Sequence, residues 1–316
     1  MDTQAAVAAR SGRVPLPAGV NRRRVVWPYA TSVAIYHVLA LLAVLPWLFS
    51  WSGVALAIVG TYLFGGLGIN LGYHRLLTHR GFACPKWLEY LCVVVGVCCM
   101  QDTPARWVAV HRRHHEQADR REDPHTPLAG FLWGHIGWML AENRDLTRLG
   151  IYDRYAKDIL RDPFYRRLER TLLYPAILLA SWAVYFVIGV AATLAGGGTL
   201  TQAAQFGASL LVWGVFVRTV AVWHITWSVN SAAHLWGYRS YDTGEQSRNN
   251  WVVALLSNGE GWHNNHHAHP RAVRHGHRAW EVDPIFGFVW VLEAVGLAWD
   301  VVRPDPKLVA SRRNAS

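Results

Sequence analysis

Nine of the 16 histidines stand in four short groups, and their spacing is the strongest chemical signal in the sequence. On a helix, positions i, i+3 and i+4 share a face, so each H-x-x-H-H group directs three imidazoles the same way. Neutral imidazole binds iron, zinc, copper and nickel, and nine imidazoles exceed what one ion accepts. The pattern therefore predicts a dinuclear metal site. The predicted ligands are His74 and His79; His111, His114 and His115; His234; and His263, His266 and His267.

Other polar residues are interpreted as supports rather than ligands. The segment 119–126 contains Asp123 and His125, and its carboxylates could accept the far N–H of a ligating imidazole and fix its tautomer. His37 and His224 stand alone in apolar runs, where a lone histidine is more often a packing group than a ligand. Three more follow the last group in a Pro/Gly/Arg-rich stretch and are expected at the surface or behind the ligands: His269, His275 and His277.

Composition points to a membrane as the setting of this site. Hydrophobic residues make up 52% of the 316 residues, and the formal net charge is +10. Seventeen tryptophans suit a membrane interface or an apolar pocket better than a nucleic-acid surface, so we expect no nucleic-acid partner. The four cysteines fall in one apolar stretch and are expected to be free and buried.

Four segments are apolar for long enough to cross a bilayer, at roughly 28–50, 53–72, 171–194 and 200–227. The links within each pair are short and uncharged, which predicts two tight hairpins. Lys and Arg concentrate outside these segments, so the positive-inside rule places both termini and the segments 73–170 and 228–302 in the cytosol. Two shorter apolar runs, 88–100 and 285–299, are expected to lie at the interface.

The predicted fold is therefore an all-α integral membrane protein. Four transmembrane helices in two hairpins carry a cytosolic helical cap, 73–170 and 228–302, which holds the histidine site. One domain covers 25–302, between loosely ordered, Arg-rich tails at 1–24 and 303–316. His74 follows the second span and His234 extends the fourth, so the metals should lie just above the membrane, within reach of an acyl chain.

At these residues the sequence resembles the stearoyl-CoA and Δ9 fatty acid desaturase family, and it is closer to the bacterial, cyanobacterial and plant branch. The resemblance implies two iron ions, with O2 reduced by externally supplied electrons and a cis double bond formed in an acyl chain. It assigns His74, His79, His111, His115 and His266 to one iron, and His114, His234, His263 and His267 to the other, with Asn230 acting through a water. The motifs that carry it are Gly72–Arg80, Trp107–His115, Asp123–His125, Asn230–Gly237 and Gly259–His267.

The resemblance also implies a substrate tunnel. Tyr62 and Gly66, four apart on the second span, match residues that close its methyl end, and Trp227 matches a tunnel-wall tryptophan. Ordinary helix packing accounts for these residue types equally well, because small residues also line span interfaces.

The acyl carrier is left open by one departure from the animal enzymes, which have an Arg-Asp pair where this chain has Ala109-Val110. CoA, a membrane lipid or a carrier protein could present the acyl chain. Five arginines near the second histidine group are candidates for its anionic head group or are simply positive-inside charge: Arg106, Arg112, Arg113, Arg120 and Arg121.

No His-Pro-Gly-Gly signature of a fused cytochrome b5 is present, so the resemblance implies a separate electron donor, either a ferredoxin, a rubredoxin or a cytochrome b5 system. The expected location is a bacterial inner membrane. A hydroxylase or acetylenase of the same di-iron superfamily is the nearest alternative. A metal transporter is remote, because transport sites lie near the midplane, where His37, His224 and Arg218 are too scattered to form a pathway.

Overall fold

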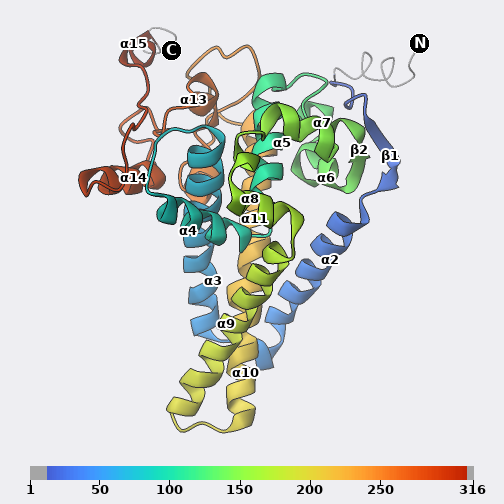
Figure 1. Ribbon diagram of the computed structural model, residues 1–316, viewed down its shortest axis with the longest axis vertical. Coiled ribbons are helices and arrows are strands. Elements are labelled where there is room, and N and C mark those ends of the chain that lie inside the picture. The colour runs from blue at the N-terminus through green and yellow to red at the C-terminus, as the bar shows by residue number, and fades with distance from the viewer. Residues whose placement is uncertain (1–12, 312–316) are drawn as a thin grey trace.

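The computed structural model describes residues 13–311 of the chain. Four helical segments are long and apolar enough to cross a membrane: Trp27–Val44, Trp51–Thr78, Leu173–Ala195 and Leu200–Leu235. They extend downward in Figure 1, and the short helices gather at their upper end, which we call the head. The prediction of a mostly helical chain with four candidate spans is confirmed.

The first two spans are separated by a break at Pro46. The first span consists of α2 (Trp27–Leu41) and the 3₁₀ turn η1 (Leu42–Val44). Leu45 is extended, with φ −71° and ψ 126°, because a residue before proline is disfavoured in the helical region. A second 3₁₀ turn, η2, covers Pro46–Leu48, and α3 begins at Trp51. The predicted link at residues 51 and 52 is therefore wrong by several residues.

The second span changes its helix type partway along. α3 (Trp51–Leu63) continues as a π-helix, η3 (Phe64–Thr78), which ends six residues beyond the predicted span. Glycines allow close packing here: a Cβ on Gly68 would lie 2.5 Å from the backbone nitrogen of Gly96 in α4 (Lys86–Val97). The span therefore reaches into the head while pressed against α4.

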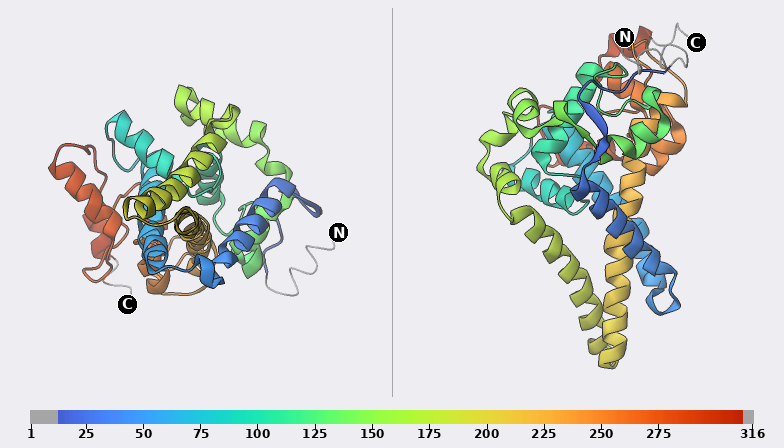
Figure 2. Two further views of the ribbon diagram at one scale, coloured as in Figure 1. Left: turned by 90° about the horizontal axis from the view of Figure 1, so that it is seen from below. Right: turned by 90° about the vertical axis from the view of Figure 1, so that its right-hand side faces the viewer.

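The third and fourth spans form a closely packed hairpin. α9 (Leu173–Ala195) and α10 (Leu200–Leu211) meet where a Cβ on Gly189 would lie 2.7 Å from the Cα of Gly207. The fourth span continues through the π-helix η8 (Val212–Val217) into α11 (Arg218–Leu235). By contrast, α2 and α3 diverge toward the head and each packs against η8 (Figures 1 and 2).

Short elements make up the head. Between the second and third spans they are α4, α5 (Pro104–Gln117), η4 (Pro127–Ala129), η5 (Trp133–Gly137), α6 (Trp138–Leu140), β2 (Ala141–Asn143), η6 (Arg144–Leu146), α7 (Arg148–Tyr155), η7 (Ile159–Arg161) and α8 (Pro163–Arg170). After the fourth span they are α12 (Trp251–Leu256), α13 (His263–Ala268), α14 (Pro284–Ala294) and α15 (Pro306–Ser311). The predicted short apolar helices correspond to α4 and α14, and α14 projects sideways (Figure 1).

The predicted N-terminal tail is wrong in part. Val20–Val25 forms strand β1, which pairs antiparallel with β2. The first 12 residues of the tail lie outside the described residues, as do residues 312–316 of the C-terminal tail. All four cysteines are free and buried, as predicted.

Candidate metal centre

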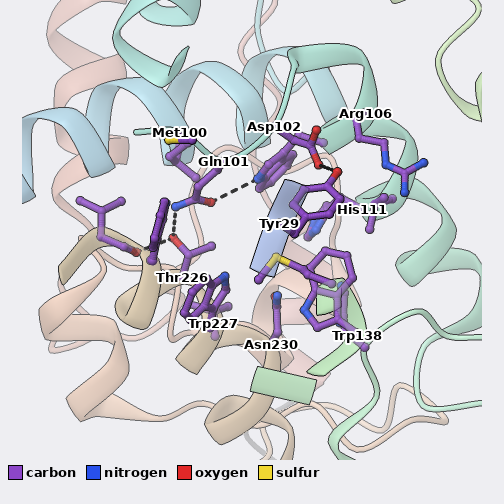
Figure 3. Close-up of a pocket in the computed structure, with 18 of the residues that line it drawn as sticks. Tyr29, Met100, Gln101, Asp102, Arg106, His111, Trp138, Thr226, Trp227 and Asn230 are labelled. Atoms are coloured by element: carbon purple, nitrogen blue, oxygen red, sulfur yellow. Dashed lines mark hydrogen bonds between the residues drawn. The ribbon is translucent and has the colours of Figure 1, made fainter. Parts of the chain in front are cut away.

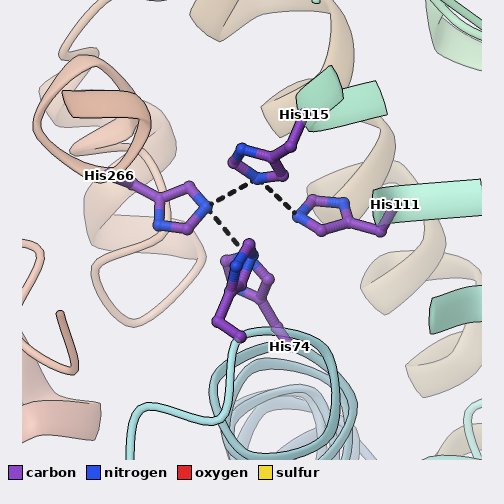
Figure 4. A group of neighbouring side chains, drawn as sticks. His74, His111, His115 and His266 are labelled. Atoms are coloured by element: carbon purple, nitrogen blue, oxygen red, sulfur yellow. Dashed lines mark hydrogen bonds between the residues drawn. The ribbon is translucent and has the colours of Figure 1, made fainter. Parts of the chain in front are cut away.

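Five histidines from three parts of the chain converge on one point in the head. The potential ligand atoms of His74, His79, His111, His115 and His266 all lie within 4.8 Å of one another. Nε2 of His115 is 3.1 Å from Nε2 of His111 and 3.0 Å from Nε2 of His266, which is 3.1 Å from Nε2 of His74 (Figure 4). The sequence elements that supply them are η3 and its end, α5 and α13.

The π-helix accounts for the spacing of five between the first two histidines. In a π-helix each N–H bonds to the carbonyl five residues earlier, and such turns are frequent at functional sites. The N–H of His79 donates to the carbonyl oxygen of His74 at 3.1 Å, and the two rings are 4.7 Å apart. The wide turn therefore brings both imidazoles to the same group.

The second group contains the remaining four predicted ligands, His114, His234, His263 and His267, again with ligand atoms within 4.8 Å of one another. Nε2 of His263 is 3.0 Å from that of His234 and 3.1 Å from that of His267. α5 and α13 each contribute to both groups, because positions i, i+3 and i+4 fan out across one helix face. The rings of His115 and His267 stack at 4.5 Å, so the two groups are adjacent.

Buried carboxylates hold one imidazole nitrogen of three of these histidines. Nδ1 of His74 lies 2.6 Å from Glu260, Nδ1 of His114 lies 3.0 Å from Asp123, and Nδ1 of His234 lies 2.8 Å from Asp119. Each carboxylate accepts the Nδ1 proton and leaves the Nε2 lone pair directed into the group. Although burial opposes ionisation, the neighbouring imidazoles, together with Arg75 at Glu260, hold the pKa of all three carboxyls below the usual range.

Arg75 balances the charge of the first carboxylate. Its Nε and Nη2 donate to Glu260 at 3.0 and 2.8 Å, and its Nη1 donates to both oxygens of Asp283 at 2.9 Å. The guanidinium is only 1% exposed. The residue next to His74 thus fixes the carboxylate that orients His74.

The donor set fits metal ions. Each Nε2 offers one lone pair or one proton in the ring plane, so Nε2 of His115 cannot satisfy two neighbouring nitrogens at once, whereas a cation between them would. Burial, reinforced by the neighbouring imidazoles, holds the pKa of six histidines well below the usual value, and the neutral imidazole is the form that binds metals. These are His79, His111, His115, His263, His266 and His267.

The structure also locates the residues expected behind the ligands. Asp123 contacts His114, whereas His125 packs on the ring of His114 at 4.3 Å. His275 is buried, with its ring 4.4 Å from that of His266; His277 is also buried, and its ring lies 5.3 Å from that of the half-buried His269. Sequence reasoning missed Glu260, although it lies inside the Gly259–His267 motif, three residues before His263.

His37 and His224 lie outside both groups, as expected, but they are not scattered. Their Nε2 atoms are 3.1 Å apart, and Nδ1 of His224 is 3.1 Å from Nε2 of His135. The chain of contacts ends at Ser231, 3.0 Å from Nδ1 of His135. These contacts join α2, α11 and η5. Arg218 is buried apart from them, on the fourth span.

A cavity of about 660 Å³ adjoins the histidine groups. Asn230 and Trp227 line it together with His74, His111 and His263 (Figure 3). It extends between α2, the fourth span and the head.

Of the three predicted tunnel residues, only Trp227 is among the residues that line this cavity. Tyr62 and Gly66 do not line it, whereas their neighbours Thr61 and Gly65 do. A Cβ on Gly66 would lie 2.8 Å from Nδ2 of Asn258, a residue that does line the cavity and that donates to the carbonyl of Tyr62 at 3.1 Å.

Five polar residues in the cavity wall are paired with one another. Nε2 of Gln101 donates to the hydroxyl of Thr226 at 2.9 Å, and Nε1 of Trp107 donates to Gln101 at 3.4 Å (Figure 3). The hydroxyl of Tyr29 donates to the buried carboxylate of Asp102. Because these groups already have hydrogen-bond partners, a bound molecule need not supply any, which suits an apolar chain.

The predicted head-group arginines are largely engaged within the protein. Arg112 donates to the carbonyls of Leu77 and Thr78 and to Asp158, which ties α5 to the end of η3. Arg113 donates to the carbonyls of Glu122 and Asp145, so neither is available to a head group. Arg106 lines the cavity but donates to the carbonyl of Leu146, Arg121 donates to that of Leu16, and Arg120 is exposed.

Known proteins share this combination of motifs. The family model described as fatty acid desaturase matches residues 45–284. The chain is 44% identical to the sn-1 stearoyl-lipid 9-desaturase of Anabaena variabilis, over 86% of this chain and 92% of that protein. It is 43% identical to the palmitoyl-monogalactosyldiacylglycerol delta-7 desaturase of Arabidopsis thaliana, over 85% of this chain and 67% of that protein. It is 41% identical to an acyl-CoA 5-desaturase of Anemone leveillei, over 85% and 77%.

Proposed function

The chain belongs to the fatty acid desaturase family, and we propose that it is an O2-dependent acyl-lipid desaturase that forms a cis double bond at the Δ9 position of a long acyl chain. The observation that carries this proposal is the contact of one cavity with both histidine groups. The relative from Anabaena variabilis, named as a lipid 9-desaturase, supports the position and the carrier. Delta-7 and delta-5 enzymes among the relatives make regiochemistry the first property to measure.

We assign one iron ion to the first histidine group and a second to the other, with Asn230 contributing through a water. Bound iron would supply the activation of O2, using two electrons from a separate ferredoxin, rubredoxin or cytochrome b5 system. The residues of the chain hold the acyl group and exclude bulk water. Trp107 stacks on His111 at 4.9 Å and lines the cavity with Trp227, so an apolar wall adjoins the ligands.

The orientation follows from charge. The Lys and Arg residues lie mainly outside the four spans, which favours a cytosolic head and termini in a bacterial inner membrane. The fourth span is about 54 Å long at 1.5 Å per residue, longer than the hydrocarbon core of roughly 30 Å. Its last turns, which carry His234, therefore extend beyond the core into the head.

Expression in a host that makes few unsaturated fatty acids tests the proposal. Lipid profiling with double-bond location should detect a new cis-Δ9 species, and His111→Ala or His266→Ala should abolish it. His269→Ala, outside both groups, is the matched control and should retain activity. Hydroxylated or acetylenic products would favour the alternative chemistries. Failure to form any unsaturated product with iron and a working donor present would overturn the proposal.

A further inference from the structure

Three arginines line a second hollow, next to the 660 Å³ cavity that adjoins the histidine groups and that we call the acyl cavity. This second hollow, about 360 Å³, is lined by residues 18–23 and by Arg144, and it therefore contains Arg22, Arg23 and Arg144. Within residues 13–311, no carboxylate is among its lining residues; the nearest acid, Asp145, accepts the N–H of the lining residue Gly19 at 3.2 Å and is paired with Arg113 at 3.5 Å. Three arginines, with the nearest acid already paired to a fourth, form an environment that favours an anion.

The two-stranded sheet presents these arginines. Asn21 pairs with Glu142 and Val25 pairs with Ala141, so residues 22–24 of β1 have no counterpart on β2. Such a bulge redirects side chains and is frequent beside active sites. All three bulged residues are exposed. The local sequence Arg-Arg-Arg therefore leaves the strand ladder where the chain is about to enter the first span at Trp27.

The same sheet forms one rim of the acyl cavity. Ala141, Glu142 and Asn143, which make up all of β2, line that cavity, and so does Val26, which follows β1 directly. Arg144, the next residue after Asn143, lines the smaller hollow. Strand β2 and the residue that follows it therefore contribute to both the cavity and the hollow. A lipid with its acyl chain in the cavity could place its polar head group in the hollow.

These arginines are available, unlike most of those suggested by the sequence. No salt bridge joins Arg22, Arg23 or Arg144 to a carboxylate within the described part of the chain. Their neighbour Arg24 is paired with Glu142 at 3.6 Å. The start of a span is also the depth at which lipid phosphates lie.

We propose that Arg22, Arg23 and Arg144 bind the phosphate of the acyl carrier while its acyl chain occupies the cavity. The inference rests on the proposed desaturase function and specifies its substrate class: a carrier with a phosphate in its head group, rather than a neutral glycolipid. A phosphatidyl lipid and an acyl-CoA share this chemistry.

Purified full-length protein, loaded with iron and supplied with electrons, is assayed on three substrates: dipalmitoyl phosphatidylglycerol vesicles, stearoyl-CoA and a dipalmitoyl monogalactosyl lipid. Arg144→Gln and the double variant Arg22→Gln/Arg23→Gln should raise KM for a phosphate-bearing substrate by about fivefold per arginine, with kcat unchanged. The galactolipid should be unaffected. Arg166→Gln on α8, which is exposed and distant in sequence, is the control.

The substrate that responds identifies the source of the phosphate: phosphatidylglycerol alone, stearoyl-CoA alone, or both. Arg144→Lys should retain most of the affinity. An unchanged KM for both phosphate substrates, or an equal rise for the galactolipid, would overturn the inference. If the wild type desaturates nothing, binding of stearoyl-CoA and of a short-chain phosphatidylglycerol to the detergent-solubilised protein, measured without turnover, tests the same arginines; in that case only the proposed function fails.

Discussion

Replacing Glu260 with glutamine should weaken metal binding more than its effect on stability explains. The carboxylate accepts protons from Nδ1 of His74 at 2.6 Å and from two nitrogens of Arg75 at 2.8 and 3.0 Å. A glutamine has one acceptor oxygen, and its NH₂ group would face a donor. Removing one partner of a buried ion pair costs about 3–5 kcal/mol, and changing a residue that orients a metal ligand lowers metal affinity or activity by about 10–100-fold.

Asp283→Asn is the matched control for this experiment. Asp283 is the other partner of Arg75, and it also accepts backbone N–H groups from Phe286 at 3.0 Å and His275 at 2.7 Å. The Asp283→Asn substitution should therefore lower the free energy of unfolding by a similar amount, about 3–5 kcal/mol. Among the described residues, however, no hydrogen bond or ion pair joins Asp283 to His74.

The assay measures iron retained per protein against a graded chelator series, together with turnover and thermal unfolding. We expect both variants to unfold at a lower temperature than the wild type. Only Glu260→Gln should release iron at a lower chelator concentration, by about 10–100-fold, which is the usual effect of changing a residue that orients a metal ligand. Equal iron retention in Glu260→Gln and the wild type, or an equal loss in Asp283→Asn, would refute the assigned role.

Two further predictions concern the cavity and the histidines. Gly65→Leu should shift products toward shorter chains, because a Cβ there lies at an ordinary 3.5 Å from Val222 and the longer side chain would enter the cavity. Gly287→Leu on α14 is the control, because Gly287 is exposed, has open space around its Cβ and does not line the cavity. Identical product profiles for the two variants would contradict this prediction. Acidification should destabilise the metal-free protein, because burial depresses the pKa of six imidazoles in the native state. The unfolded chain therefore binds more protons below about pH 6.5, and the free energy of unfolding falls by up to about 1.4 kcal/mol per pH unit for each imidazole. A melting temperature that does not change between about pH 8 and pH 5 would argue against this.

Local spacing was sufficient to predict the histidine groups on α5 and α13. There the helix period alone determines that positions i, i+3 and i+4 share a face, and the structure brings all nine predicted ligands into two groups. The division between the groups came from the family resemblance, because spacing within one helix does not say which imidazole meets which partner helix.

Other parts of the site depend on tertiary packing. The spacing of His74 and His79 suits a π-helix, which forms where the glycines of η3 pack against α4. The change of helix type at Phe64 also explains why a single period is a poor guide to the cavity face of this span. Glu260 lies in a turn with no periodicity, and its role depends on Arg75, 185 residues earlier in the chain. The bulge of β1 likewise requires pairing with a strand about 120 residues away.

A buried arginine connects the fourth span to the head. Arg218 is 0% exposed; its Nε donates to the carbonyl of Gly214 at 2.7 Å, and its Nη2 donates to that of Cys98 at 3.0 Å. Its guanidinium lies 4.1 Å from the ring centroid of Phe64. A charged side chain is tolerated within the fourth span because it contacts carbonyl oxygens and an aromatic ring rather than lipid.

The carbonyl of Cys98 lies at the C-terminus of α4, where a cation is favoured by the helix dipole. Trp223 donates to the next one, Cys99, at 2.8 Å. The chain then turns through Met100 and Asp102, both at positive φ, and this turn places Gln101 in the cavity wall against Thr226. Arg218, Trp223 and Thr226 all belong to the fourth span. The helix that carries His234 therefore also holds the segment after α4 that contributes Gln101 to the cavity wall. A shift of this helix would therefore move both together, which would keep a chain bound in the cavity aligned with the histidine groups.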